Sequence, residues 1–326
     1  SAGTRKPRPA SLNPSMLPDK SPEFQFIDRI RQQAGEFPGV RLGIGDDAAA
    51  VTFESGRPAV ITADMLLEGV HFRCPPATAR QVGRKSINVN LSDLAAMAAT
   101  PRYAVVTVCL PRGESPDRNS FADELMAGML EASAEFDVAI VGGDTTSWDG
   151  PLVVSVTAIG EAHEKGLVTR SRARPGDWIC VTGELGGSLA GRHLDFTPRV
   201  REAQFLHEAT TLTAMLDVSD GLVADLYHIL EESSCGAILD ASVIPISEAA
   251  QKKEDENSPL QRALGDGEDF ELLFMLSESD GEALLCNPEL PVQVTRIGEI
   301  VSEEGCQLRD GNSVTKLPRL GWAHQL

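Results

Sequence analysis

Short apolar runs alternate with helix-like patterns along most of the chain. In the first half, strands are predicted at Ala59–Thr62, Tyr103–Leu110, Val138–Val141 and Leu152–Glu161. Between them, apolar residues at helical spacing predict helices at about 79–98 and 117–135, and an earlier amphipathic helix from Glu23 to about Ala34. Such mixing of strands and helices favours an α/β or α+β fold.

The second half repeats this alternation after a break at 162–177. The break is basic, contains Pro-Gly and precedes a predicted strand at Trp178–Thr182, so a domain boundary is expected within it. A glycine turn and a helix follow, to about residue 192. Further elements are predicted as helices near 199–214 and 221–233, strands near 237–240, 270–276 and 293–300, and a solvated loop at Gln251–Ser258.

Composition divides the chain into three expected regions. Residues 1–22 are rich in Pro, Ser and basic residues without apolar periodicity, which predicts a disordered leader. The remainder is expected to form an N-terminal domain at 23–163 and a C-terminal α/β domain at 164–326. The length of 326 residues fits two domains that each bury a core.

The acidic charge narrows the classes of partner. The formal net charge is -19, which disfavours nucleic acid and anionic membranes as partners in the absence of a basic patch. Either the charge serves solubility, or many Asp residues converge on metal ions. The six scattered cysteines form no Cys-x-x-Cys pair, and no apolar run approaches the roughly 18 residues of a membrane span. A reduced, cytoplasmic protein is expected.

Carboxylates recur in short motifs that follow apolar runs or open helices. The motifs are Gly45-Asp46-Asp47, Ala63-Asp64-Met65, Asn90-Leu91-Ser92-Asp93, Gly142-Gly143-Asp144-Thr145-Thr146, Asp217-Val218-Ser219-Asp220-Gly221 and Asp266-Gly267-Glu268-Asp269. A single such Asp is usually a turn former or helix N-cap. The whole set favours Mg²⁺, which prefers carboxylate and phosphate oxygens, and a phosphoryl-transfer site whose charge the metal neutralises.

Competing motifs are weaker. Gly43–Ala48 fits a dinucleotide pattern, but no clear strand precedes it and two carboxylates would face the pyrophosphate. Gly83–Ser86 lacks the Gly-Lys pair of a P-loop, and no Gly-x-Ser-x-Gly elbow is present. Gly183–Ser188 either cradles a phosphate or simply turns the chain. His71 is either structural or a contact beside the expected metal site.

Taken together, these motifs resemble thiamine-monophosphate kinase, within the aminoimidazole ribonucleotide synthetase superfamily. The resemblance runs from about Glu23 to Trp322 and rests on EFQFIDRI, LGIGDDAA, ITADMLLEGVHF, KSINVNLSDLAAMAATP, VGGDTT, LVTRSRARPGDWICVTGELGGSLAG, DVSDGLVADLYHI, GDGEDFELLF and the terminal GW. It implies a two-domain PurM-like fold whose N-terminal sheets pair into a barrel in a homodimer. It also implies that the N-terminal domain binds ATP and Mg²⁺ and forms the dimer.

The implied activity is transfer of the γ-phosphate of ATP to thiamine monophosphate, giving thiamine diphosphate. Direct in-line transfer assisted by several Mg²⁺ ions is expected. The acceptor is already an anionic phosphate, so no general base is required and catalysis rests on positioning and charge neutralisation.

The resemblance also assigns roles to individual residues. The implied metal ligands are Asp47, Thr62, Asp64, Asp93, Asp144, Asp217 and Asp220, with Asp64, Asp93, Asp144 and Asp220 as catalytic carboxylates. The implied ATP contacts are Tyr103, Gly143, Asp144, Arg170 and Ser219. The implied thiamine-phosphate contacts are His71, Glu268 and Trp322, where Trp322 either stacks on the thiamine rings or anchors the C-terminal core.

Some features depart from the family pattern, and other functions stay open. Ala63 replaces a usual Thr or Ser, Asp266 replaces a usual Gly, and the stretch between Gly191 and Pro198 is short. The alternatives are an aminoimidazole ribonucleotide synthetase-like enzyme, a selenophosphate synthetase-like enzyme or a non-catalytic ligand-binding relative. Residues 1–46 lack the reactive Cys expected of the second, and the intact acidic motifs argue against the third.

Overall fold

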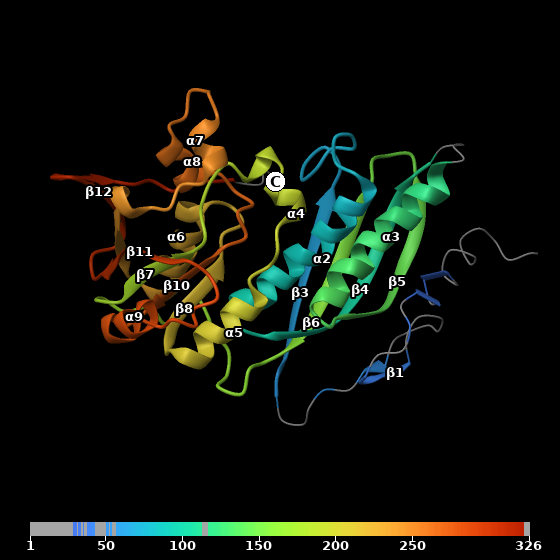
Figure 1. Cartoon of the computed structure of the whole chain (residues 1–326), viewed down its shortest axis with the longest axis horizontal. Helices are drawn as coiled ribbons and strands as arrows, with labels where there is room; N and C mark the ends of the chain where they lie inside the picture. The colour runs from blue at the N-terminus through green and yellow to red at the C-terminus, as the bar shows by residue number, and fades with distance from the viewer. Residues whose placement is uncertain are drawn as a thin grey trace, which may run out of the picture.

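The computed structural model describes residues 57–112 and 117–322, together with 29–30, 32–33, 35, 38–42, 50–51 and 53. Two α/β halves lie side by side along the long axis of the molecule, each built on its own sheet (Figure 1). The first half contains β3 (Ala59–Leu67), β4 (Thr100–Pro111), β5 (Ala139–Trp148) and β6 (Val153–Glu161), with α2 (Ala79–Ala96) and α3 (Asp117–Glu135). A small pair, β1 (Val40–Leu42) and β2 (Ala50–Val51), accompanies it.

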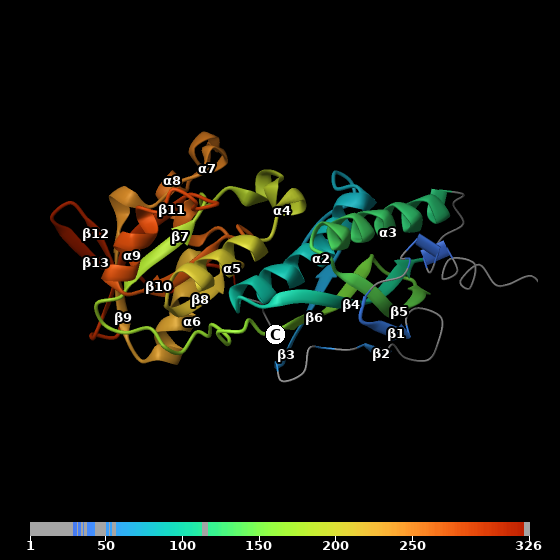
Figure 2. The same ribbon diagram turned by 60° about the horizontal axis from the view of Figure 1, so that its bottom comes forward.

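The four-stranded sheet of the first half has the order β3-β6-β4-β5. β4 and β5 run parallel and are joined through α3, whereas β3, β6 and β4 are antiparallel. Both helices cover the same face of the sheet (Figures 1 and 2). Residues alternate along β3, so Val60 and Leu66 face α2 and are buried, whereas Ile61 and Met65 face the other side and are exposed.

Helix α2 is the most buried helix of the first half. It begins with a capping box, in which the Thr78 side chain accepts from the amide of Gln81 and the Gln81 side chain accepts from the amide of Thr78. Lys85, Ser86, Asn88, Asn90 and Ser92 are buried along it, which is unusual for polar residues in a helix. The helix packs on α3, β3 and β6 of its own half and on elements of the second half.

The second half is built on a seven-stranded sheet with the order β13-β12-β9-β11-β7-β10-β8. Its strands are β7 (Trp178–Thr182), β8 (Leu212–Asp217), β9 (Gly236–Asp240), β10 (Leu272–Leu276), β11 (Val294–Val301), β12 (Gly305–Asp310) and β13 (Ser313–Lys316). Its helices are η2 (Ser188–Ala190), α4 (Arg192–Asp195), α5 (Val200–Ala209), α6 (Leu222–Ser233), η3 (Ala241–Val243), α7 (Glu248–Lys252), α8 (Pro259–Gly265) and α9 (Glu278–Leu285).

Both faces of this sheet are covered, and β10 shows the consequence. Leu272, Phe274 and Leu276 pack into a core that continues through α5 into the first half. Leu273 and Met275 point the other way, into a core with α6 and α8. A strand buried on both faces has an unbroken apolar sequence, as Leu272–Leu276 does. Because one core is shared, the two halves meet through an apolar contact.

Most predicted elements are confirmed, with shifted ends. α3 and β7 have their predicted bounds, and α2, α6, β9, β10 and β11 lie within about two residues of theirs. The loop at 251–258 is exposed, although its first two residues close α7. Residues 29–30 and 32–33 are helical, but most of the predicted helix from Glu23 and the whole predicted leader lie outside the described residues.

Several predictions about secondary structure are wrong. The strand predicted at Ala59–Thr62 continues to Leu67, so Asp64 lies within β3 rather than after it. The helix predicted up to about residue 192 is the short 3-10 helix η2, and α4 begins only at Arg192. The helix predicted over 199–214 ends at Ala209, and Leu212–Asp217 forms strand β8. Thr210, Thr211 and Thr213 are β-branched and favour the extended backbone that Thr210 adopts at the helix end. The strand predicted at Val138–Val141 continues to Trp148, so the Gly-Gly-Asp motif lies within β5 rather than in a turn after it.

Candidate active site

A cavity of about 230 Å³ opens between the two halves. Residues from both halves line it, and those predicted as functional are Asp64, His71, Asp93, Asp217, Ser219, Asp220, Glu268 and Trp322. They come from β3, the turn after it, α2, the end of β8 and the loop that follows, the segment before β10 and the stretch after β13. The fold therefore gathers residues separated by more than 200 positions in the sequence, and most of them are acidic.

Asp64 and Asp93 form the centre of the acidic group. Asp64 lies on the face of β3 that meets α2, and Asp93 lies in the last turn of that helix. Burial, followed by the neighbouring charge of Asp93, raises the pKa of Asp64 to about 7. Burial also raises the pKa of Asp93, against hydrogen bonds from Thr62 and Asp64 and the charge of Arg170. Two carboxyls that cannot easily ionise together are a suitable pair for a cation.

Asp217 and Asp220 bring the second half to this pair. Asp217 is buried at the end of β8 and accepts a hydrogen bond from Ser92 Oγ at 2.6 Å. Burial, with the charge of Asp93 as the next cause, raises the pKa of Asp217 well above its usual value. The loop of Asp220 is held by Asp225, whose Oδ2 accepts from the amides of residues 219, 220 and 221 at 2.9–3.1 Å. Oxygen and nitrogen atoms of Asp220, Asp225 and His228 lie within 4.8 Å of one another.

A second cavity, of about 450 Å³, lies on the other side of Asp93. Thr62, Arg170, Met215 and His228 are among its lining residues, and Asp93 lines both cavities. Arg170 is exposed and its charge acts on Asp93. An exposed cation and carboxylates along the same cavity suit a ligand that carries both phosphate and bound metal.

The predicted acceptor contacts also line the smaller cavity. His71 Nδ1 accepts from the Leu67 amide at 3.0 Å, so a neutral His71 has its proton on Nε2. Lys85 is fully buried and donates to both carboxylate oxygens of Glu268, at 2.7 and 2.8 Å, and to the His71 carbonyl at 3.0 Å. Trp322 is 58% exposed, so it is not a core anchor.

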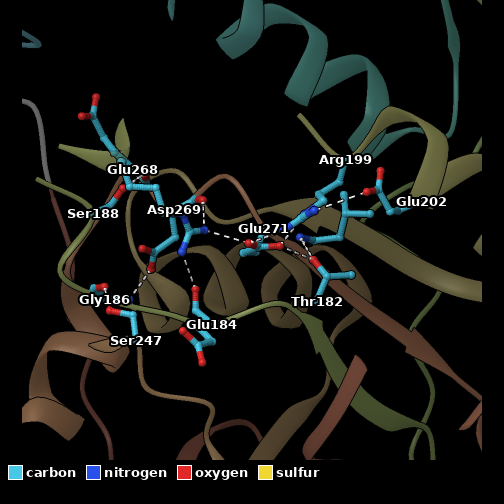
Figure 3. A network of polar contacts seen from close by, with 12 residues as sticks. Thr182, Glu184, Gly186, Ser188, Arg199, Glu202, Ser247, Glu268, Asp269 and Glu271 are labelled. Carbon is cyan, nitrogen blue, oxygen red and sulfur yellow. Dashed lines mark hydrogen bonds and ion pairs between the residues drawn. The ribbon is translucent and has the colours of Figure 1, made fainter. Parts of the chain in front are cut away.

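The segment that carries Glu268 is fixed by a polar network, shown in Figure 3. Glu271 is 2% exposed and accepts from Thr182 at 2.7 Å, from Arg192 at 2.7 Å and from Arg199 at 2.7 and 2.8 Å. The Gly186 amide donates to Asp269 at 2.7 Å. Burial raises the pKa of Asp269 to about 7. The backbone of Glu268 is held in the left-handed region, at φ 63°, which these contacts stabilise.

The network also decides the role of the glycine turn. The amides of Gly186 and Gly187 donate to Asp269 and Asp266, and the amide of Leu185 donates to the Pro245 carbonyl. These amides are used within the protein, so the segment is a turn rather than a phosphate cradle. Asp266, a departure from the family pattern, takes part in holding it.

Other predicted residues are not brought to the cavities. Asp144 and Gly143 lie on β5, whereas Asp64 lies on β3, at the opposite edge of the four-stranded sheet. Strand register places Asp144 opposite Thr107, on the face turned away from α2. Tyr103, on the same face, is 3% exposed and packs edge-on against Phe53 with ring centroids 5.5 Å apart. Asp47 lies outside the described residues.

The structure also adds residues that the motifs did not single out. Lys85 and Asp225 contact predicted site residues, and His228 lines the larger cavity. Glu271 anchors the segment that carries Glu268 through Thr182, Arg192 and Arg199. Each lies inside a stretch that carried the family resemblance, but a lone charged residue within a helix or strand pattern gives no signal of burial. Ala63 is exposed on the face of β3 opposite Asp64, so a hydroxyl there would point away from the carboxylate pair.

Comparison with known proteins agrees with this architecture. The model "AIR synthase related protein, N-terminal domain" matches residues 45–162, and the corresponding C-terminal domain model matches residues 174–311. A hydrogenase maturation protein HypE in complex with ATP, 20% identical over 96% of this chain and 98% of its own, superimposes with a TM-score of 0.74 and supports the fold alone. The chain is thus an AIR synthase-related protein with the PurM-like fold.

Closer relatives narrow this class. Thiamine-monophosphate kinase of Rhodopirellula baltica is 40% identical over 89% of this chain and 93% of its own, and that of Escherichia coli K12 is 35% identical over the same shares. The crystal structure of thiamine-monophosphate kinase from Stenotrophomonas maltophilia K279a is 35% identical over 88% of this chain and 96% of its own, with a TM-score of 0.77. The chain belongs to the thiamine-monophosphate kinase family.

Proposed function

We propose that this protein transfers the γ-phosphate of ATP to thiamine monophosphate, giving thiamine diphosphate and ADP. The observation that carries the proposal is that Asp93 lines both cavities. A nucleotide in the larger cavity and an acceptor in the smaller one would therefore meet at the carboxylates. The solved structure of a relative, AaThiL complexed with AMPPCP and TMP, is 30% identical over 93% of this chain and 97% of its own with a TM-score of 0.73, and it supports binding of both ligands by one protein.

The proposed reaction is a direct displacement. An oxygen of the acceptor phosphate forms a bond to the γ-phosphorus of ATP while the bond from that phosphorus to the ADP oxygen breaks. The acceptor oxygen is already anionic, so no side chain has to remove a proton. Arg170 of the larger cavity and Ser219 of the smaller one are the proposed nucleotide contacts, and His71, Glu268 and Trp322 of the smaller cavity are the proposed acceptor contacts.

The carboxylates fit Mg²⁺. The charge of Asp93 makes ionisation of Asp64 and of the buried Asp217 more costly, so a hard cation would relieve the repulsion. When bound, Mg²⁺ supplies positive charge that neutralises the phosphates. Asp220 and Thr62 are proposed as further ligands. Asp47 and Asp144 stay proposed ligands, although the fold of a single chain does not bring Asp144 to the group.

A homodimer is the proposed setting for the β5 residues. On the face of the four-stranded sheet turned away from α2, the apolar residues Ile61 (66%) and Met65 (53%) are exposed. In a monomer these side chains would be in contact with water, which is unfavourable. Pairing of two such faces into a barrel would place Tyr103, Gly143 and Asp144 near the second copy. Substitution Ile61→Asp should then give a monomer by light scattering, and an unchanged dimer would exclude this face.

The remaining expectations follow from the same proposal. We assign nucleotide and metal binding and dimer formation to residues 23–163, and the α/β cover of the site to residues 164–326. The six cysteines are all free thiols, which supports a reducing compartment such as the cytoplasm. Within the part of the chain that the structure describes, no helix is both long and apolar enough to cross a bilayer.

A turnover assay tests the proposal. ADP release is measured with thiamine monophosphate, with thiamine and without acceptor, and thiamine diphosphate is measured by chromatography. The expected result is ADP release and equimolar thiamine diphosphate only with the monophosphate and Mg²⁺. ADP release that is independent of the acceptor, or none at all, would contradict the proposal.

A further inference from the structure

One face of helix α2 carries polar residues that all contact the second half of the molecule. They are Gln81, Lys85, Asn88 and Ser92, spaced four, three and four residues apart, and we call them the α2 polar stripe. This spacing places them along a single side of a helix. Elsewhere in globular proteins such an inward-facing stripe is apolar.

Each member of the α2 polar stripe donates a hydrogen bond across the junction between the halves. Gln81 Nε2 donates to Asp195 at 2.7 Å, and Asn88 Nδ2 donates to the Phe196 carbonyl at 2.8 Å. Ser92 Oγ donates to Asp217 at 2.6 Å. The Lys85 ammonium donates to Glu268 at 2.7 and 2.8 Å.

Lys85 is the member of the α2 polar stripe whose burial is most costly, because it carries a charge. Its side chain is fully buried, and burial lowers its pKa against the opposing charge of Glu268. A buried ion pair of this kind adds little net stability compared with apolar packing, so its position is better explained by the geometry that it fixes. All three ammonium protons are used, on the two Glu268 oxygens and the His71 carbonyl.

The contacts of Lys85 therefore join two predicted acceptor contacts that come from different halves. Glu268 reaches over from the second half, and its carboxylate is the part that Lys85 holds. The Glu268 side chain is still 20% exposed and lines the smaller cavity. Each oxygen retains a lone pair beyond the one that Lys85 occupies, which leaves the carboxylate able to accept from a ligand.

We propose that Lys85 is a positioning residue for the acceptor: anchored on the His71 carbonyl, it sets the Glu268 carboxylate at the distance that thiamine monophosphate requires. The inference rests on the proposed function. Lys85 does not touch the substrate, and it acts only through the groups that it holds. The larger cavity contains none of these groups, so nucleotide binding is independent of it.

The test compares Lys85→Met with Arg84→Met. Arg84 is the next residue of the same helix and pairs with Glu135 of α3 at 3.3 Å, within the first half. Lys85→Met should raise the KM for thiamine monophosphate about tenfold or more and leave the KM for ATP within about twofold, because a neutral side chain no longer holds Glu268. Arg84→Met should change neither. Equal increases in both KM values, or lower thermal stability with unchanged KM values, would refute the positioning role.

A second comparison covers the case in which Lys85→Met does not fold. Removing both charges avoids an unpaired buried charge, so Lys85→Met with Glu268→Gln should fold more readily. If Lys85 acts through Glu268, the double variant should show the same KM for thiamine monophosphate as Glu268→Gln alone. A further tenfold increase would refute the inference. Wild-type protein without acceptor-dependent turnover would instead refute the proposed function, which separates the two failures.

Discussion

Replacing Asp93 by asparagine should remove turnover and yet stabilise the metal-free protein. Asp64 has a pKa of about 7 in the folded protein and 3.8 when unperturbed. At about 1.36 kcal/mol per pKa unit, keeping Asp64 ionised in the fold costs at most about 4 kcal/mol. Burial is the larger cause and the charge of Asp93 the second. The share that Asp93→Asn removes is therefore on the order of 1 kcal/mol.

The pH range in which Asp93→Asn stabilises the metal-free protein follows from the direction of the pKa shift of Asp64. Because the folded pKa is raised, the contribution of Asp64 to stability is fully present below about pH 4 and is lost as the pH rises through about 7. At pH 8 without metal, Asp64 is ionised, and the wild-type protein is destabilised by the full cost of burying that charge. The variant should then melt about 2–4 °C higher than wild type, and the difference should shrink towards pH 5.

The assay is a thermal melt in chelator at pH 5 and pH 8, together with ADP release at saturating Mg²⁺. Turnover should fall by about three orders of magnitude, since one charge near the phosphates is lost. Asp149→Asn is the matched control, because the Asp149 side chain is 81% exposed and lies outside both cavities. A lower melting temperature for Asp93→Asn at pH 8, or wild-type turnover, would show that Asp93 is not part of a repelling, catalytic pair.

Three further substitutions test separate parts of the site. Trp322→Ala should raise the KM for thiamine monophosphate more than that for ATP without lowering the melting temperature, because the side chain is 58% exposed; equal KM effects would argue against stacking. His71→Ala should slow single-turnover transfer by much less than the 10²–10⁴-fold typical of a lost base, measured at about pH 6–9 with saturating acceptor, and a loss of about 10³ or more would identify a base. Glu271→Gln should lower the free energy of unfolding, measured by urea melts, by about 1.5–3 kcal/mol. The reason is that the NH2 group of Gln would face the donors of Arg192 and Arg199. An unchanged midpoint would mean that the charge of Glu271 does not stabilise the fold.

The pattern of apolar residues predicted a helix or strand correctly wherever the element has one clear apolar face. α3 and β7 came out with their bounds because a helical spacing or a short apolar run is visible in a few residues. The sequence predicts a helix over the first residues of β8, because Leu212–Met215 mixes apolar and threonine residues without a clear period. Its strand form depends on pairing with β10, a partner about 60 residues away.

Part of the candidate site could also be predicted, because its motifs are visible in a few neighbouring residues. The acidic motifs carry Asp64, Asp93, Asp217 and Asp220 in the sequence, and the fold brings all four to one cavity. The Gly-Gly-Asp motif looked equivalent, yet β5 places Asp144 on another edge and another face of its sheet. A motif shows which side chains are available, but the face of a strand and the order of strands are set by register.

Residue chemistry, the alternation of elements and family membership can be read from the sequence, because they depend on neighbouring residues and on motif identity. Which groups face one another depends on the three-dimensional fold. Lys85, hidden in the middle of α2, reaches Glu268 at a separation of 183 positions. Raised pKa values at Asp64 and Asp217 arise from burial and from charges brought close by folding. Such effects act through space and fall off over a few ångströms, so no local pattern in the chain can express them.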